Sequence, residues 1–330
     1  MKITNKACLS KSVVDALTFD DYDLSLPPPN IFSCTTIIDA PRPYFLRTRH
    51  DSEITIDVLD NVWLLDGSAV HYAVEMSNKS KGSDRLSEER FYIEAPIYRG
   101  EWAVHQKMPG TKIEDQPWYS TDKYYCSVKF DHYDPEEKAI EDYKRTSPWE
   151  WVHGIKPSRE RQLNIGAFAL SLAGFPVEVC RVCFFFKDFD KRKAAEGGDY
   201  PATPIAQKNL SVWSNKERED YILERMEIFI EASKKIDSNL PVCSEEDRWY
   251  IPGTVALMKN DNIKATKVFD EGDTDGMATY LEKAKMEYPK AIWQWEKRRG
   301  IDKRCEEYCR GHEFCTYFQN SVTCVGQSGY

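Results

Sequence analysis

Hydrophobic and polar positions recur with two different periods along the first two thirds of the chain. Between residues 57 and 79 the apolar side chains recur near the helical period, which predicts an amphipathic helix; they are Val62, Leu65, Ala69, Tyr72, Ala73 and Met76. Short apolar or alternating runs predict three strands, at 91–98, 123–133 and 138–144. The turn residues DPEE at 134–137 join the last two strands as a hairpin.

The next segments continue the alternation of helix and strand. Residues 158–174 are typical of a helix, with Ser158 as its N-cap and Gly174 as its C-terminal stop. Residues 176–189 are typical of a buried strand. The order of helix, three strands, helix and strand predicts an α/β fold.

The pattern changes to helical after residue 204. The segment 214–236 begins with a capping box, Ser214 followed three residues later by Glu217. Residues 274–288 predict another amphipathic helix, and the basic segment 289–304 is also expected to be helical. We therefore expect a C-terminal helical lobe that also carries cysteines.

These patterns suggest three parts of one integrated domain. Residues 1–56 are expected to form an N-terminal extension that packs on the core. Residues 57–240 form the core, and residues 241–330 form the helical, cysteine-bearing lobe that closes onto it.

Composition and charge narrow the function classes. The chain has 41% hydrophobic and 30% charged residues, which is typical of a soluble globular protein, and no run of about 18 apolar residues that would span a membrane. The first residues become acidic too early for a secretory signal, so a cytoplasmic protein is expected. The net charge of −9 argues against polyanion binding by the whole surface but leaves room for a local basic groove.

Two carboxylates of the predicted hairpin suggest a metal site. Asp131 ends one strand and Asp142 lies near the end of the next, so the hairpin can bring them together. Adjacent carboxylates repel unless a cation lies between them, and oxygen ligands favour Mg²⁺ or Mn²⁺. Lys144 shares a strand face with Asp142 and can stabilise a charged phosphate, while His71 can complete the metal shell. The alternative for Asp142 and Lys144, taken singly, is a surface ion pair.

The same residues resemble a known family. The stretches GSAVH, FDHYD, IEDYKRTS and QLNIGAFALSLAGFPVEVCRVCFFFKDF are similar to the PD-(D/E)XK nuclease superfamily. The resemblance is to its RecB-like branch, with phage recombination exonucleases and the iron–sulfur nucleases of CRISPR spacer acquisition. It covers about residues 57–190 and continues weakly to residue 315. It implies a restriction-endonuclease-like core, a mixed central sheet flanked by helices in the order αβββαβ.

The resemblance also implies residue roles. It makes His71, Asp131, Asp142 and the backbone carbonyl of Tyr143 metal ligands, and Lys144 the catalytic lysine. Gln162 would position Lys144 or the DNA. Glu75, four residues after His71 on the same helix face, would bind a second metal or a water; the alternative is a carboxylate on the helix surface.

Two positions depart from the family pattern. The family often has glycine three residues before the first aspartate, where this chain has Val128. Its helix motif is Gln-x-x-x-Tyr, where this chain has Gly166 in place of the tyrosine. Neither position is a metal ligand.

Cysteines near the C-terminus form a second candidate site. Cys305, Cys309 and Cys315 are spaced C-x3-C-x5-C, and Cys243 lies upstream. Four thiolates can hold a [4Fe–4S] cluster or a zinc ion. His312 is a rival ligand for zinc, and free reduced thiols are the third interpretation. The C-x2-C pair Cys180 and Cys183 lies on a predicted strand, where residues three apart face opposite sides, so we interpret both as core thiols.

The expected function is that of a metal-dependent DNA exonuclease of recombination or repair, of the phage type. A structure-specific endonuclease and a non-cleaving protein that binds DNA ends remain alternatives. The expected partners are DNA and a single-strand annealing recombination protein, with no membrane.

Overall fold

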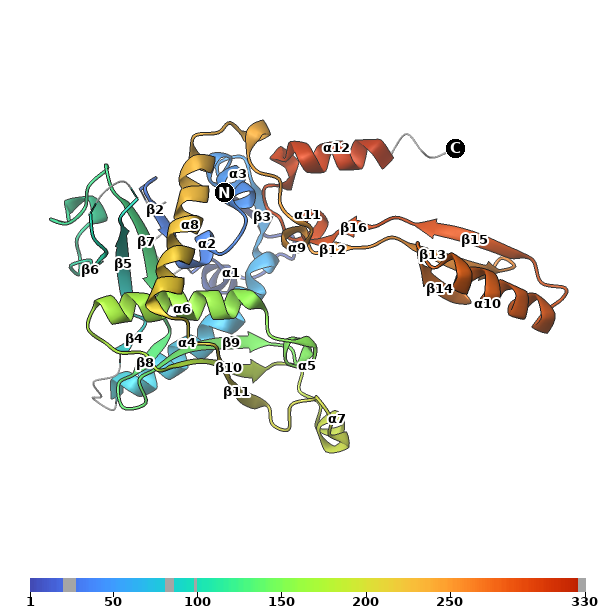
Figure 1. Cartoon of the computed structure of the whole chain (residues 1–330), viewed down its shortest axis with the longest axis horizontal. Coiled ribbons are helices and arrows are strands. Elements are labelled where there is room, and N and C mark those ends of the chain that lie inside the picture. Colours follow the sequence, from blue (N-terminus) through green and yellow to red (C-terminus); the bar gives the residue numbers. More distant parts are fainter. Residues whose placement is uncertain (20–27, 81–85, 98–99, 326–330) are drawn as a thin grey trace. The chain divides into compact units, whose positions relative to one another are not determined.

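The computed structural model of the chain describes residues 1–19, 28–80, 86–97 and 100–325. The fold is mixed α/β (Figure 1). It divides into two compact units: the first consists of Met1–Pro41 and His50–Lys235, and the second of Arg42–Arg49 and Ile236–Tyr330. Among the described residues, no helix combines the length and apolar character that a membrane span requires.

Two sheets organise the first unit. One has the strand order β2-β7-β5-β6, and the other has the order β11-β10-β9-β8-β4. The strands of the first sheet are β2 (Ile31–Ser33), β5 (Arg90–Ala95), β6 (Ala103–Gln106) and β7 (Tyr124–Lys129). Those of the second are β4 (Leu86–Ser87), β8 (His132–Asp134), β9 (Ala139–Thr146), β10 (Val179–Phe186) and β11 (Ile205–Leu210). A small parallel pair is formed by β1 (Lys2–Thr4) and β3 (Thr55–Asp57).

The predicted hairpin exists, but with a shorter first strand. Strands β8 and β9 are antiparallel and pair His132 with Glu141 and Asp134 with Ala139. The single strand expected over 123–133 is two strands, β7 and β8, which belong to different sheets. The chain changes sheet at Phe130–Asp131, so Asp131 lies at the junction rather than inside a strand.

Strand β10 adds to β9 in parallel, with Asp142 opposite Val182 and Lys144 opposite Phe184. A parallel pair needs a crossover connection, and α6 (Pro157–Leu172) supplies it. The helix predicted over 158–174 is therefore confirmed, and Gly174, at φ +88°, follows its end. The N-cap prediction is wrong: Lys156 is the N-cap and Pro157 takes the first helical position, where its missing N–H costs nothing.

The helix expected within 57–79 is α4 (Val62–Ser80), but its apolar stripe does not face the core. Tyr72 is 64% exposed and Met76 is 44% exposed. The partly buried side chains are instead those of the opposite face, including His71 and Glu75. The stripe that makes the helix predictable is therefore its solvent face, and the inward face mixes His71 and Glu75 with Val70 and Val74.

Other helices of the first unit complete it. Helix α8 (Asn215–Ser233) begins with the predicted capping box, in which the side chains of Ser214 and Glu217 each bond to the other's backbone N–H. The remaining elements are α1 (Lys11–Thr18), α2 (Cys34–Ile37), η1 (Val58–Asn61), η2 (Ile113–Asp115), α5 (Trp149–His153) and α7 (Lys191–Glu196).

The second unit contains a β-sheet as well as helices. Strands β13 (Thr254–Lys259), β14 (Lys267–Asp270) and β15 (Trp293–Arg298) form an antiparallel sheet in the order β14-β13-β15. Its core of Leu257, Phe269 and Ala284 is covered by α10 (Thr274–Glu287), the helix predicted over 274–288. The other elements are α3 (Pro41–Arg49), η3 (Asp237–Asn239), α9 (Glu245–Arg248), β12 (Tyr250–Ile251), β16 (Ile301–Asp302), α11 (Lys303–Glu307), η4 (His312–Phe314) and α12 (Thr316–Val325).

The expected helix over 289–304 is wrong, and the C-terminal lobe is not purely helical. Half of that segment is β15 and β16. Trp293 pairs with Lys259 of β13 and packs on the core of the sheet. The alternation of Trp293 and Trp295 suits a strand, and pairing with β13 outweighs the helical tendency of the basic residues around them.

Candidate functional site

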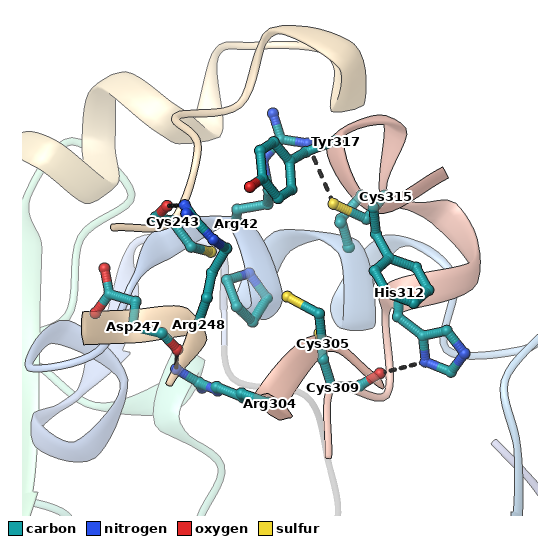
Figure 2. A pocket seen from close by; sticks show the side chains of 13 residues that line it. Arg42, Cys243, Asp247, Arg248, Arg304, Cys305, Cys309, His312, Cys315 and Tyr317 are labelled. Atoms are coloured by element: carbon teal, nitrogen blue, oxygen red, sulfur yellow. Dashed lines mark hydrogen bonds between the residues drawn. The ribbon is translucent and has the colours of Figure 1, made fainter. Parts of the chain in front are cut away.

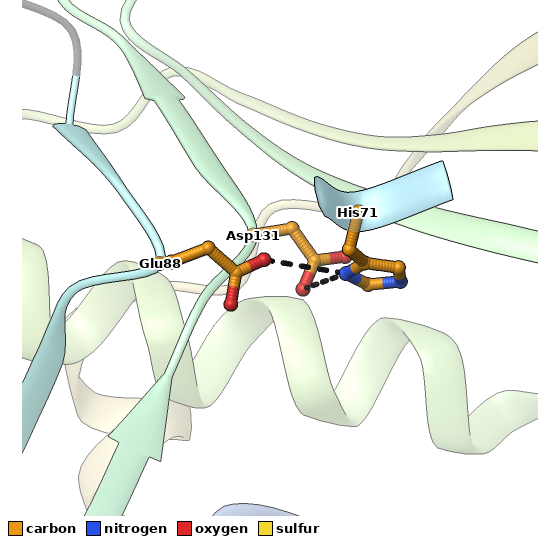
Figure 3. Close-up of side chains that lie close together, drawn as sticks. All are labelled: His71, Glu88 and Asp131. Atoms are coloured by element: carbon orange, nitrogen blue, oxygen red, sulfur yellow. Dashed lines mark hydrogen bonds and ion pairs between the residues drawn. The ribbon is translucent and has the colours of Figure 1, made fainter. Parts of the chain in front are cut away.

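Three side chains from separate elements meet in the first unit (Figure 3). His71 comes from α4, Glu88 follows β4, and Asp131 lies at the β7–β8 junction. Nδ1 of His71 lies 3.3 Å from Glu88 Oε1 and 3.3 Å from Asp131 Oδ1. One ligand atom from each residue lies within 4.8 Å of the others, so this group could hold a metal ion.

The backbone of Tyr143 links this group to strand β9. Its N–H donates to Asp131 Oδ2 at 2.6 Å, and its carbonyl oxygen lies 3.1 Å from His71 Nε2. The backbone of Tyr143 therefore contacts two of the candidate ligands, with its N–H at Asp131 and its carbonyl at His71. A β-strand carbonyl has a fixed direction, so it can serve as a ligand without the side chain.

Asp142 and Lys144 lie on the adjoining part of β9. Lys144 Nζ donates to Asp142 Oδ1 at 2.7 Å, and Gln162 Nε2 from α6 donates to the same oxygen at 3.1 Å. Asp142 is 3% exposed, so this is not a surface ion pair. Its other oxygen, Oδ2, is buried and has no hydrogen-bond partner in the described part of the chain. A buried carboxylate oxygen without a donor is costly, and a cation would satisfy it.

The pKa values of Asp142 and Asp131 are shifted in opposite directions. Burial raises the pKa of Asp142, and the attraction of Lys144 does not cancel that effect. Burial also raises the pKa of Asp131, but the hydrogen bond from His71 and the nearby Lys144 outweigh it, so its pKa is lowered. For His71, burial lowers the pKa, yet the hydrogen bonds to Asp131 and Glu88 raise it to about 10. The carboxylates thus favour positive charge at this position, which either a proton on His71 or a metal ion that replaces the proton supplies.

The donor set fits a hard divalent cation. Carboxylates, a backbone carbonyl and one imidazole are ligands that Mg²⁺ or Mn²⁺ accepts. His71, Asp131, Glu88 and the Tyr143 carbonyl lie together, and Asp142 offers its unpartnered oxygen. Glu75 lies on the same face of α4 as His71 but is not one of the three grouped residues.

Glu88 is the site residue that the sequence did not reveal. Its backbone has φ +58°, and its N–H donates to the Asp131 carbonyl at 3.2 Å. Its second oxygen pairs with Lys129 at 2.6 Å. Burial raises the pKa of Glu88, but the bonds from His71 and Lys129 outweigh it and lower the pKa. The only cue in the sequence is the acidic pair Glu88–Glu89 just before a strand.

The four candidate cysteines line one pocket of the second unit (Figure 2). Cys243 precedes α9, Cys305 lies in α11, and Cys309 and Cys315 lie on either side of η4. The pocket has about 400 Å³ of empty space, including the part open to solvent. Burial raises the pKa of Cys243 and of Cys305 to about 12. A positive centre would therefore be needed to hold these thiols as thiolates.

The pocket also has basic residues. Arg42 donates to Cys315 Sγ at 3.6 Å and to the carbonyls of Pro241 and Leu240. Arg248 donates to the carbonyl of Cys243. Guanidinium groups beside a set of thiolates would offset part of their charge. Arg42 comes from α3, far away in the sequence.

Tetrahedral zinc and a [4Fe–4S] cluster each take four thiolates, which this pocket offers. The rival ligand His312 has its Nδ1 2.7 Å from the Cys309 carbonyl.

The prediction that Cys180 and Cys183 are core thiols is confirmed. Both lie on β10 and both are buried. Cys183 accepts a hydrogen bond from Gln207 at 3.4 Å. The nine cysteines whose side chains the structure describes are free thiols.

Comparisons with known proteins add little. No family model matches the chain, and no curated protein matches it. A solved structure, "Crystal structure of SSO0001", is similar with 14% identity and a TM-score of 0.42, covering 66% of this chain and 83% of that one. A TM-score of this size does not establish a shared fold, so nothing is concluded from it.

Proposed function

We propose that this chain is a metal-dependent deoxyribonuclease with a restriction-endonuclease-like core, in agreement with the PD-(D/E)XK resemblance. The observation that carries the proposal is the buried, unpartnered Oδ2 of Asp142. Asp142 precedes Tyr143, whose carbonyl oxygen contacts His71, and the other oxygen of Asp142 accepts a hydrogen bond from Lys144. A surface ion pair or a packing carboxylate would not leave a buried oxygen without a donor.

Different residues of the site would bind the metal ion and stabilise the charge that develops on the phosphate. His71, Asp131, Glu88, Asp142 and the Tyr143 carbonyl would hold Mg²⁺ or Mn²⁺. When bound, the ion would supply positive charge to a phosphate oxygen and lower the pKa of a water molecule. Lys144 brings positive charge to the place where negative charge develops on the phosphate, and Gln162 fixes the carboxylate that orients Lys144.

Within this class we favour an exonuclease of DNA recombination or repair, of the phage type, that acts in the cytoplasm beside a single-strand annealing protein. The family resemblance supports this choice. An endonuclease that recognises DNA structure is the alternative, because the same active site serves both.

For the cysteines we propose a [4Fe–4S] cluster held by Cys243, Cys305, Cys309 and Cys315. The convergence of the four on one pocket supports a bound metal group, and the resemblance to the iron–sulfur nucleases favours a cluster over zinc. Anaerobic purification should give a brown protein with iron and acid-labile sulfide. Stoichiometric zinc without iron would overturn the cluster assignment.

The activity test compares end-labelled linear DNA with closed circular DNA in the presence of Mg²⁺ or Mn²⁺. Loss of the linear form alone supports the exonuclease, and cutting of circles supports the endonuclease. Lys144→Ala should abolish cleavage. The matched control is Lys138→Ala, because Lys138 is an exposed lysine that pairs with Glu178 outside the site. If the wild-type protein bound the DNA but cleaved neither form, the proposal that it is a nuclease would be refuted.

A further inference from the structure

Two tryptophans of the first unit are mostly exposed. Trp63 is 66% exposed in the first turn of α4, and Trp149 is 62% exposed at the start of α5. Tryptophan is usually well buried, because its large apolar ring is costly to hydrate. Figure 1 shows α5 at the arrowhead ends of β9 and β10.

Direct contacts bring Trp63 to the same strand ends. Lys187, which follows β10, donates its backbone N–H to the carbonyl of Thr146, the last residue of β9, at 2.9 Å. The Lys187 ammonium lies 3.4 Å from the centroid of the Trp63 ring. Trp149 follows Thr146 by three residues. Both exposed rings therefore belong to the edge at which β9 and β10 end.

This edge carries several basic side chains, together with the acidic Asp188 and Asp190. Besides Lys187 it carries Arg145, which pairs with Asp66 of α4 at 3.3 Å. His153 packs against Trp149 with ring centroids 4.5 Å apart and the ring planes tilted by 39°. Helix α7 follows β10 with three exposed basic side chains in succession, at 191–193. Exposed aromatic faces among cations are the combination that binds single-stranded nucleic acid.

We propose that Trp63 and Trp149 form a stacking site for single-stranded DNA, next to the candidate active site. The proposal rests on the proposed deoxyribonuclease function and names the form of DNA that it takes. A base needs an open aromatic face, which only an unpaired strand can use, because the bases of a duplex already stack on one another. Lys187, Arg145 and the cations of α7 then lie where the phosphates of the strand run.

The distance from Trp63 to the candidate metal site fits a single strand of DNA. Trp63 and His71 are eight residues apart on one helix, or about 12 Å at 1.5 Å per residue. That length corresponds to about three or four nucleotides if the bases of the strand keep the stacked rise of about 3.4 Å.

The test measures binding of the full-length protein in a chelator, so that cleavage does not interfere. Fluorescence anisotropy compares labelled oligo(dT) with a dumbbell duplex that has no free ends. Trp63→Leu and Trp149→Leu should each weaken oligo(dT) binding by about five- to a hundredfold and leave duplex binding almost unchanged. Trp63→Phe and Trp149→Phe are the matched controls, because phenylalanine keeps the aromatic face; they should retain most of the affinity.

A second measurement locates the contact. An oligonucleotide that carries 5-iododeoxyuridine should crosslink to the peptides that contain Trp63 or Trp149 on irradiation. The proposal is overturned if the leucine variants bind oligo(dT) like the wild type, if they lose duplex binding equally, or if the wild type does not bind oligo(dT). If the wild type cleaves DNA and the leucine variants bind oligo(dT) as it does, only the stacking site is refuted. If binding depends on the tryptophans but the wild type cleaves no DNA, only the nuclease proposal is refuted.

Discussion

Gly166 of α6 lies directly against Ile140 of β9: a Cβ at position 166 would be 2.6 Å from Ile140 Cδ1. A side chain at position 166 would therefore require the buried side chain of Ile140 to move. Gln162, one turn earlier on α6, donates to Asp142 on the same strand.

Gly166→Ala should destabilise the protein by about 1–3 kcal/mol, because the added methyl overpacks the core. Replacing an ordinary glycine inside a helix by alanine instead stabilises the protein, since alanine is the better helix former. Urea unfolding measures the effect. Adding Ile140→Val removes the Cδ1 atom and should recover part of the loss; simple additivity of the two changes would contradict the contact.

Asp142→Asn should abolish metal binding and cleavage. The amide keeps the shape but loses the negative charge that the cation and Lys144 require. Calorimetric titration with Mn²⁺ measures binding, and circular dichroism checks the fold. Glu141→Gln is the matched control, because Glu141 lies next to Asp142 but pairs with Arg181. It should bind Mn²⁺ as the wild type does, and equal losses in both variants would argue against Asp142 as a ligand.

Glu88→Gln and Glu75→Gln separate two acidic side chains near His71. Because Glu88 is 3.3 Å from His71 Nδ1 and belongs to the three-residue group, its substitution should weaken Mn²⁺ affinity at least about tenfold. Glu75→Gln should change the affinity less. A larger loss with Glu75→Gln would mean that Glu75 is the ligand.

Acid should remove the contribution of a buried ion pair to stability. Glu150 is 3% exposed and accepts from Arg159 at 3.1 and 3.2 Å. Burial raises its pKa, but the bonds from Arg159 outweigh that effect and lower the pKa below 4.5. The pair therefore stabilises the fold above pH 4.5, and the stabilisation is lost as the pH falls through the lowered folded-state pKa.

The comparison for this prediction is Glu150→Gln. At pH 7 it should be less stable than the wild type by about 1–3 kcal/mol in urea unfolding. The difference should shrink as the pH falls below 4.5. A constant difference at every pH would show that the charge of Glu150 is not involved.

Local sequence signals predicted the elements whose stability is local. The capping box of Ser214 and Glu217 marks the start of α8, and Gly174 marks the end of α6. The hairpin at 134–137 brings Asp131 to the backbone of Tyr143, because its turn residues set the register of β8 on β9.

Features that depend on distant contacts were not predictable. Strand β15 forms because β13 pairs with it, and the basic composition of the segment gave no sign of that partner. Glu88 enters the site through its backbone bond to Asp131, more than 40 residues later in the chain. Arg42 reaches the cysteine pocket from 199 residues before Pro241. Period and spacing describe neighbours in the sequence, and these contacts are between segments that only the fold brings together.

The outward apolar stripe of α4 has a consequence for local unfolding. No described side chain of this helix is fully buried, whereas α6 buries every residue from Leu163 to Leu170. Little hydrophobic burial holds α4, so its amide protons should exchange with solvent faster than those of α6. Bound Mn²⁺ should slow the exchange around His71, because the ion ties the helix to two strands. The cation would then reduce the local unfolding of α4, the least stable helix of the site.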